Sequence, residues 1–266
     1  MFLADFHVHS NFSDGRHPIP EIVDLFGRQG FGAIAFTDHI CESTSVLGKA
    51  SAYLGCSLTP ATFPLYIEIL KSEAERAWDQ YRMVVLPGFE LTKNSISNHR
   101  SAHVLGIGVD SFVDANQDIT QQCRAIQNQG GLAIAAHPVW TRKWEKQTYH
   151  LWSRKEELAQ YFDAWEVASG PYVFEEVRNA GFKMIASSDL HSKRQMTSWK
   201  TVLHCERHPE AILQAIKRQE LGFHFYREPK ESYDYSFDTS RVFSVGSRHR
   251  NDPMGNVFFP SAVTSS

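Results

Sequence analysis

Short apolar runs alternate with amphipathic segments along most of the chain. The runs are rich in Val, Ile, Phe and Ala and mostly lack strict polar alternation, which is typical of strands covered on both faces. The expected strands are FLADFHV, GAIAFTD, MVVLPGFEL, AHVLGIGV, GLAIAAHP, FDAWEVA, KMIASSD and KTVLHCE. Because helix-like segments separate them, the pattern predicts βαβ units, parallel strand pairing and an α/β fold.

The segments between these runs predict helices. Pro20 stands near the start of the first, EIVDLFGRQG, and Gly30 marks its end. The others are PLYIEILKSEAERAWDQYR, DITQQCRAIQNQGG, VFEEVRNAGF and PEAILQAIKRQELG. Residues 41–64 interrupt the rhythm, because this stretch is long for a connection between a strand and a helix. It is either a lid or rim of a substrate pocket or a plain surface loop.

The domain organisation follows from length and pattern. A chain of 266 residues fits one large α/β domain. We expect this domain to span residues 1–228, because the sequence becomes polar and aperiodic after Arg227. Residues 229–266 are expected to form an irregular C-terminal tail that is either poorly ordered or packed across the domain.

Composition narrows the class of protein. Hydrophobic residues at 42% and charged residues at 21% describe an ordinary globular protein, and the net charge of −3 gives no global attraction to nucleic acid or anionic membranes. The four cysteines form no CxxC pair, so neither a zinc ribbon nor a disulfide framework is indicated. We see no signal peptide and no apolar run long enough to span a membrane. A cytoplasmic enzyme or binding domain is expected.

Metal-capable side chains recur where the predicted strands end. One of them, His103, stands instead at the beginning of its strand. In barrels of parallel strands, the C-terminal end of the strands is where active sites are built. His7 and His9 alternate along one strand and therefore point the same way. The ligand-type residues at these strand edges are His7, His9, Asp38, His39, Glu90, His103, His137, Asp189 and His191.

The mixture of these side chains indicates which metals they suit. Packing six imidazoles together without metal or counter-charge would leave buried polar groups unsatisfied. Imidazole with carboxylate and without thiolate is typical of Zn, Mn, Fe or Co sites. Nine candidates exceed what one ion uses, so several ions bridged by a carboxylate are expected.

The motifs HVHSNFSDG, AFTDH, PGFELT, AHVLGIG, AIAAHP and SSDLHS, taken in this order, closely resemble those of the PHP (polymerase and histidinol phosphatase) family. The resemblance covers roughly residues 3–204. It implies a distorted (β/α)7 barrel, similar to a TIM barrel, with up to three divalent ions at the C-terminal face of the strands. Several members of the family hydrolyse phosphoesters.

Carried over by motif, the resemblance implies a trinuclear metal centre with three sets of ligands. The first ion would be held by His7, His9, Glu90 and Asp189. Glu90 would bridge to a second ion, which is completed by His103 and His137. The third ion would be held by Asp14, His39 and His191. The family often has histidine at the position of Asp14, and aspartate is also common there.

The resemblance and the chemistry of paired metal ions predict a metal-dependent hydrolase that cleaves phosphoester bonds by metal-activated hydroxide. The expected catalytic residues are Glu90, Asp189 and His191, with either His191 or a metal-bound water as the leaving-group acid. The expected cofactors are two or three Zn, Mn or Fe ions per chain. The expected substrate is a small phosphorylated metabolite, a nucleotide or a short oligonucleotide, and no obligate protein partner is evident.

Two other classes of function stay open. Metal-rich barrels of amidohydrolase type also hydrolyse C–N or carboxylic ester bonds. A noncatalytic, metal-stabilised module that binds a partner is the other alternative.

Basic residues after the motifs are candidates for phosphate binding. Arg16 is the leading one, and the others are Lys93, Arg100, Arg142, Lys193 and Arg194. Tryptophans interleaved with basic residues between Trp140 and Arg154 either stack a base or fix a long loop to the barrel. Asp38 either orients a ligand imidazole or caps the following helix.

Overall fold

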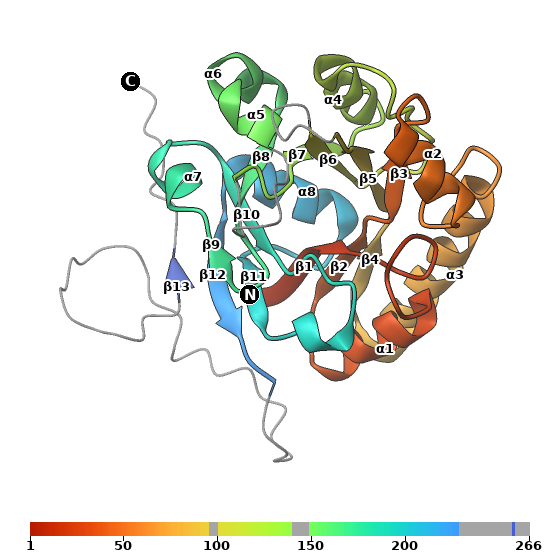
Figure 1. Ribbon diagram of the computed structural model, residues 1–266. Helices are drawn as coiled ribbons and strands as arrows, with labels where there is room; N and C mark the ends of the chain where they lie inside the picture. The colour runs from red at the N-terminus through yellow and green to blue at the C-terminus, as the bar shows by residue number, and fades with distance from the viewer. Residues whose placement is uncertain (96–100, 140–148, 229–256, 259–266) are drawn as a thin grey trace.

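The computed structural model describes residues 1–95, 101–139, 149–228 and 257–258 (Figure 1). The predicted C-terminal tail, residues 229–266, therefore falls almost entirely outside the described residues, as do Arg100 and Arg142. The described chain is a mixed α/β fold in which helices lie outside two curved sheets (Figure 1).

One sheet contains the first strand of the chain, and its strand order is β13-β12-β11-β1-β2-β4. Its strands are β1 (Phe2–Val8), β2 (Ala33–Phe36), β4 (Val84–Leu86), β11 (Ser198–Leu203), β12 (Leu221–Tyr226) and β13 (Val257–Phe258). The pairs β1–β2 and β2–β4 are parallel, whereas β1–β11, β11–β12 and β12–β13 are antiparallel. The β12 strand was not expected from the sequence, where its first two residues, Leu221 and Gly222, belong to a predicted helix.

The other sheet has the order β10-β8-β7-β6-β5-β3, with a short strand β9 paired to β8. Its strands are β3 (His39–Cys41), β5 (Gly88–Lys93), β6 (Ala102–Ile107), β7 (Leu132–Ala135), β8 (Ala164–Ser169), β9 (Tyr172–Val173) and β10 (Met184–Ser187). The β6 strand is antiparallel to both β5 and β7. The expectation of parallel pairing throughout is therefore wrong for β6, as it is for β11 and β12.

The two sheets do not join into a continuous ring of hydrogen-bonded strands within the described residues. They are linked by a parallel bridge between Val8 and Leu190, beyond the end of β10. Thr201 of β11 adds a side-chain link, because its hydroxyl accepts from the Ala186 N–H and donates to the Ala186 carbonyl. The α/β class is confirmed, whereas the closed (β/α)7 barrel is not.

Helices cover the outer faces of the sheets. They are α1 (Ile19–Arg28), α2 (Val46–Tyr53), α3 (Phe63–Tyr81), α4 (Ile119–Gln127), α5 (Tyr149–Ser153), α6 (Lys155–Leu158), α7 (Glu175–Asn179) and α8 (Pro209–Arg218). The five predicted helices are found as α1, α3, α4, α7 and α8. In α1 the buried residues recur at helical spacing, with Ile19, Ile22, Val23 and Phe26 facing the core.

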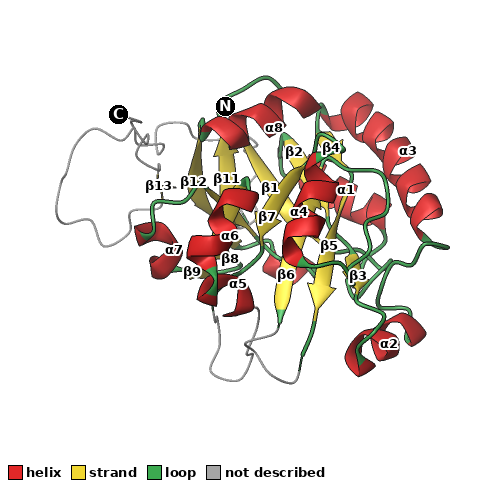
Figure 2. Cartoon of the chain, turned by 90° about the horizontal axis from the view of Figure 1, so that it is seen from above, coloured by secondary structure: helices red, strands yellow, loops and turns green. Residues whose placement is uncertain are grey.

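Two ends of the molecule can be distinguished in Figure 2. The N-terminus and α8 lie at one end, and α2 lies at the other (Figure 2). The β1 strand starts at the first of these ends, so the parallel strands direct their C-terminal ends toward the end that carries α2. Residues 41–64 contain α2 and lead into α3. No helix in the described ranges combines the length and apolarity that crossing a bilayer requires.

Candidate metal centre

The nine predicted metal ligands come together at one place although they are far apart in the sequence. His7 lies on β1, and His9 follows that strand. Asp14 lies in the loop before α1, while His39 and Glu90 lie on β3 and β5. The remaining four are His103 near the start of β6, His137 after β7, and Asp189 and His191 after β10.

The direction of β6 explains the one ligand that stands at the beginning of a strand. Thr92 near the end of β5 is opposite His103, and Val104 is opposite Ala135, the last residue of β7. The antiparallel β6 strand therefore starts where β5 and β7 end. His103 joins the site for this reason.

The most deeply buried group consists of two histidines and two carboxylates. Glu90 Oε2 lies 3.4 Å from His7 Nε2 and 3.5 Å from His9 Nε2. Asp189 Oδ1 lies 3.4 Å from His7 Nε2 and 3.3 Å from His9 Nε2. The side chains of His7, His9 and Glu90 are fully buried. Their ligand atoms converge on one point, which an ion can occupy.

The other oxygen of Glu90 faces a second pair of histidines. Glu90 Oε1 lies 2.8 Å from His103 Nδ1 and 3.3 Å from His137 Nε2. One carboxylate thus presents Oε1 to His103 and His137 and Oε2 to His7 and His9, and Oε2 also lies 2.9 Å from His39 Nδ1. This is the disposition that a carboxylate bridging two ions requires.

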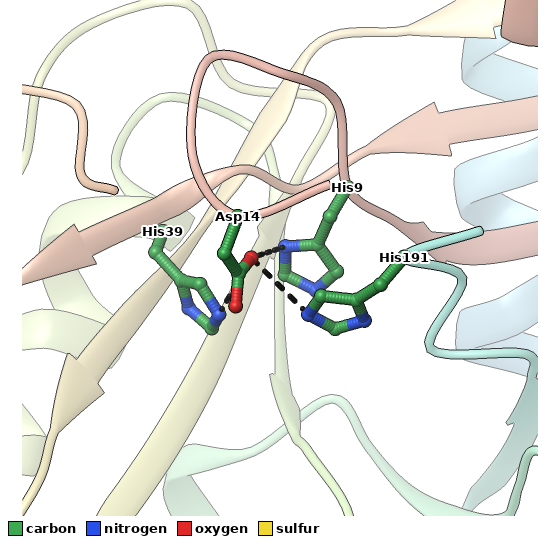
Figure 3. A group of neighbouring side chains, drawn as sticks. All are labelled: His9, Asp14, His39 and His191. Carbon is green, nitrogen blue, oxygen red and sulfur yellow. Dashed lines mark ion pairs between the residues drawn. The ribbon is translucent and has the colours of Figure 1, made fainter. Parts of the chain in front are cut away.

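A third group is more open and is shown in Figure 3. Asp14 Oδ1 lies 3.2 Å from His191 Nε2, 3.5 Å from His39 Nε2 and 3.9 Å from His9 Nδ1 (Figure 3). The side chain of Asp14 is 41% exposed and that of His191 is 28% exposed. These four side chains form one of the groups able to hold a metal ion, so His9 faces both this group and the buried one.

The donor atoms fit divalent ions. Within the described part of the chain, His7 Nε2, both ring nitrogens of His9 and Glu90 Oε2 are buried without a hydrogen-bond partner. Leaving such atoms without partners costs about 1–3 kcal/mol each, and more for a charged group. All of them face the converging side chains, so bound ions would satisfy them. The mixture of imidazole and carboxylate suits Zn, Mn or Fe.

The charges of the site act on one another strongly. Burial alone would lower the pKa of His7, but the carboxylates of Glu166, Asp189 and Glu90 raise it well above its ordinary value. Burial and the neighbouring His191 and His39 lower the pKa of His9 to about 3. Burial disfavours the charged form of Glu90, yet His103 and His39 hold its pKa well below the usual range. The carboxylates therefore stay ionised, and their negative charge attracts cations.

Glu166 of β8 is a site residue that the sequence reasoning missed. It is fully buried, its Oε1 lies 2.9 Å from His7 Nδ1, and its Oε2 accepts from the His137 backbone N–H at 2.7 Å. A carboxylate on the second nitrogen of a ligand imidazole fixes the tautomer and the ring orientation. The available signal was a lone carboxylate within the apolar run FDAWEVA.

Two further side chains orient ligand histidines. The Thr92 hydroxyl lies 2.7 Å from His39 Nδ1, which leaves Nε2 directed toward Asp14. Asn94 Oδ1 lies 3.0 Å from His103 Nε2, which leaves Nδ1 directed toward Glu90. His39 Nε2 therefore faces Asp14 and His103 Nδ1 faces Glu90, while His39 Nδ1 also lies 2.9 Å from Glu90 Oε2.

Asp38 takes neither of the two roles considered for it. Its carboxylate accepts from the Ser10 N–H at 2.9 Å, from the Ser10 hydroxyl at 2.8 Å and from the Ser13 hydroxyl at 2.7 Å. Asp38 thereby anchors the loop that carries Asp14. The side chain is fully buried, and this burial raises its pKa despite these hydrogen bonds.

The predicted phosphate-binding residues lie in different parts of the chain. Arg16 is exposed, and its backbone N–H donates to the His191 carbonyl at 2.9 Å, so it lies directly beside the third group of ligands. Lys193 and Arg194 are exposed and closely follow His191; Lys193 Nζ lies 3.5 Å from Glu21. Lys93 ends β5. Arg142 lies outside the described residues.

The tryptophan-rich stretch is described only in part. Trp140 and Trp144 fall outside the described residues. Trp152 packs against Trp165 and Phe182, with ring centroids 6.1 and 6.2 Å away. Trp152 therefore fixes its segment to the domain, which is the second of the two roles considered.

Comparison with known proteins identifies the family. The model of the PHP domain matches residues 5–203 of the chain. The chain belongs to the PHP domain family. A PHP domain thus accounts for the described strands from β1 to β11. A comparison with curated protein sequences finds no match.

Two of the solved structures that match the chain differ in how well they superimpose on it, and only the first supports a related fold. One is a two-domain protein from Bacteroides vulgatus containing a predicted PHP-like metal-dependent phosphoesterase, with 22% identity and a TM-score of 0.62. The match covers 85% of this chain and 65% of that protein, so the chain spans less than two thirds of its length. The other is an amidohydrolase from Chromobacterium violaceum with bound sulfate and no metal, with 15% identity, coverage of 71% and 88%, and a TM-score of 0.47.

Replacement of Glu166 by glutamine is expected to lower metal affinity about 10- to 100-fold, the usual effect of removing a partner of a ligand imidazole. The neutral amide no longer stabilises the His7 orientation in which Nε2 faces Glu90 and Asp189. Isothermal titration with Mn²⁺ or Zn²⁺ measures the effect, and Glu157→Gln, a carboxylate exposed on the surface, is the matched control. Equal affinity of Glu166→Gln and wild type would refute this role.

Metal binding is expected to release protons and to weaken as the pH falls below about 9. The pKa of His191 is raised to about 9, because the hydrogen bond to Asp14 and the charge of Asp189 outweigh burial. At neutral pH, an ion must therefore displace a proton from His191. The same raised pKa stabilises the metal-free fold fully below the unfolded value of about 6.5, and this stabilisation is lost as the pH rises toward 9. Calorimetry in buffers of different ionisation enthalpy counts the protons; release of none at pH 7 would contradict it.

Proposed function

We propose that this PHP domain is a metal-dependent hydrolase that cleaves the phosphoester bond of a small phosphorylated metabolite, a nucleotide or a short oligonucleotide. The observation that carries the proposal is the Glu90 carboxylate, whose two oxygens face separate groups of histidines: Oε1 faces His103 and His137, and Oε2 faces His7, His9 and His39. Two ions held by such a bridge can stabilise both the attacking and the leaving oxygen of an in-line displacement.

The ligand geometry supports a specific assignment of residues to ions. His7, His9, Glu90 and Asp189 would hold the first ion. Glu90, His103 and His137 would hold the second. Asp14, His39 and His191 would hold the third, with His9 Nδ1 also facing this site. The more exposed third site favours an occupancy of two or three ions per chain, with Zn, Mn or Fe as the metal.

The side chains divide the catalytic work among themselves. When bound, the ions would supply an activated water and neutralise the charge of the phosphate. Glu90 would hold both buried ions and Asp189 the first of them, since both carboxylates contact His7 and His9. His191, whose Nε2 lies 3.2 Å from Asp14 and whose Nδ1 lies 3.5 Å from Asp189, or a metal-bound water would protonate the leaving oxygen.

Substrate contacts are proposed for the basic residues beside the third site. Arg16, Lys193 and Arg194 come from two loops that meet where the Arg16 N–H binds the His191 carbonyl. Their exposed side chains suit the remaining charge of a phosphorylated substrate. Lys93 and Arg142 remain candidates for the same role.

The proposal also covers the extent of the catalytic domain and the rim of its active site. We assign residues 1–228 as the catalytic domain and residues 41–64 as part of the rim of its active site. The second assignment is supported by α2, which stands at the end of the molecule toward which the parallel strands point (Figure 2). Tyr53 and Leu54 at the end of α2 are 91% and 72% exposed, which leaves them available for contact with substrate.

The test is a substrate screen on purified protein loaded with Mn²⁺, Zn²⁺ or Fe²⁺. The panel contains phosphomonoesters, nucleotides and short oligonucleotides, together with amides and lactones. Phosphate release from one class supports the proposal. Hydrolysis of amides or lactones, with phosphate acting only as an inhibitor, would replace it with an amidohydrolase-type activity. Metal binding without turnover of any compound would indicate a noncatalytic module.

A further inference from the structure

A buried ion pair lies beneath the metal centre, on the side of the N-terminal ends of the parallel strands. Asp5 of β1 and Lys200 of β11 are both fully buried, and Lys200 Nζ donates to Asp5 Oδ2. The antiparallel register, with Ala4 opposite Thr201, brings the two residues next to each other at the end of the ladder. The pairing of β1 with β2 is irregular between Asp5 and Val8, and the His7 N–H donates to Asp5 Oδ1 at 3.5 Å, so the ion pair lies beside the first of the proposed ligands.

The other oxygen of Asp5 holds the chain just before a metal ligand. Asp5 Oδ1 accepts from the Ser188 N–H at 3.0 Å. The next residue, Asp189, has a φ of 54°, in the left-handed region that is strained for a residue with a Cβ atom. This backbone conformation determines where the Asp189 carboxylate points.

Lys200 also reaches the chain just after the same ligand. Lys200 Nζ donates to the Ser198 hydroxyl at 3.0 Å, and this hydroxyl donates to the Gln195 carbonyl at 2.7 Å. The side-chain amide of the same Gln195 donates through its NH₂ group to the Asp189 carbonyl at 2.9 Å, and its oxygen accepts from the His191 backbone N–H at 2.8 Å. The ion pair is therefore connected to the backbone on both sides of Asp189.

Stability alone does not account for this pair. Taking two charges out of water is costly, and replacing a buried pair with apolar residues of similar volume is often neutral or stabilising. A second buried carboxylate repeats the arrangement: Glu166 accepts from the N–H of His137, which has a φ of 25°. In both places a buried carboxylate holds a backbone amide at or next to a metal-capable residue with a left-handed backbone.

We propose that the Asp5–Lys200 pair is a positioning unit that holds the left-handed backbone at Asp189 and so directs its carboxylate toward His7 and His9. Asp5 supplies the hydrogen-bond acceptor for Ser188. Lys200 supplies the counter-charge and the link through Ser198 and Gln195. This inference rests on the proposed metal centre, because Asp189 is one of its ligands.

The test separates the acceptor from the charge. The double variant Asp5→Asn with Lys200→Met removes both charges but keeps an oxygen for the Ser188 N–H, whereas Asp5→Leu with Lys200→Met removes the acceptor as well. The probe is Co²⁺, measured by the visible absorption of the bound ion and by titration. We expect the leucine variant to bind Co²⁺ about 10- to 100-fold more weakly with an altered spectrum. The asparagine variant keeps the acceptor for the Ser188 N–H and loses only the Lys200 link, so we expect it to lose less Co²⁺ affinity than the leucine variant.

A second comparison shows whether the effect passes through Asp189. In an Asp189→Asn background, adding Asp5→Leu with Lys200→Met is expected to cause no further loss of Co²⁺ affinity. In a His103→Asn background, the full loss is expected. Asp5→Ala with Lys200→Met is measured in parallel, because alanine removes the acceptor without the branched side chain that leucine adds. Thermal unfolding verifies that each variant folds.

Three results would overturn the inference: wild-type Co²⁺ binding by the folded leucine and alanine variants, equal losses in the asparagine and leucine variants, or full persistence of the loss in the Asp189→Asn background. If the wild type itself binds no Co²⁺, Zn²⁺ or Mn²⁺, the metal centre fails, and the inference fails with it. The two failures are therefore distinguishable.

Discussion

Glu90→Gln is expected to reduce hydrolysis of the best substrate from the screen at least about 100-fold, because one bridging carboxylate contributes several kcal/mol through the ions it holds. Glutamine has nearly the same shape as glutamate but lacks the negative charge, and its NH₂ group cannot coordinate a metal ion. Glutamine therefore cannot bridge one ion beside His103 and His137, on the Oε1 side, and a second ion beside His7 and His9, on the Oε2 side. Steady-state kinetics and metal analysis of the same preparation measure the loss.

The matched control for this substitution is Glu73→Gln. Glu73 is also buried, but it pairs with Arg76 on α3 and lies outside the cluster of nine residues. We expect it to change the free energy of unfolding and not the metal content. If Glu90→Gln retains both its ions and its rate, Glu90 does not bridge ions in this protein.

Chelation of divalent ions is expected to abolish hydrolysis and to lower Tm by about 10 °C. Ions present at 1,000 times their Kd stabilise a protein by about 4 kcal/mol, and 1 kcal/mol corresponds to about 2–4 °C for a domain of this size. The physical origin lies in the buried atoms of His7, His9 and Glu90 that have no hydrogen-bond partner among the described residues. Differential scanning calorimetry before and after chelation measures the shift.

Restoring the ions completes this experiment. Adding Mn²⁺ or Zn²⁺ to the chelated protein should recover both Tm and activity, which distinguishes metal loss from irreversible damage. The Glu90→Gln variant should show a smaller decrease in Tm, because it holds fewer ions from the outset. An unchanged Tm with full activity in the presence of the chelator would contradict metal dependence.

Local patterns in the sequence were sufficient to predict much of the metal centre. His7 and His9 alternate along a strand, so their convergence follows from a period of two residues. The other ligand-type residues follow apolar runs, and strand ends at one edge of a sheet lie close together. The motifs in this order then indicated the PHP family, which the match over residues 5–203 confirms.

Residues that act through single long-range contacts could not be predicted in this way. Glu166 interrupts an apolar run, but only the fold brings it to His7 and to the His137 N–H. Asp38 stands beside a predicted ligand, yet its partners Ser10 and Ser13 belong to a loop 25 to 28 residues earlier. A side chain with several possible partners is assigned only when the tertiary structure brings one of them within reach.

Strand direction also depended on the tertiary structure. The apolar pattern of β6 is the same whether it pairs in parallel or antiparallel, so its reversal was not predicted, and neither was the reason why His103 stands at a strand start. The hydrogen-bonded connection between the two sheets is likewise a property of three-dimensional contacts, here Val8 with Leu190 and Thr201 with Ala186.

The sequence by itself determined the α/β class, five of the helices and which side chains can bind metal, because periodicity and side-chain chemistry are local properties. Only the tertiary structure decided how these groups face one another: Glu90 between two pairs of histidines, and Asp189 supported by Asp5 and Lys200. Asp5 and Lys200 are separated by 195 positions. Contacts over such separations are selected by the packing of the whole chain, and no local pattern records them.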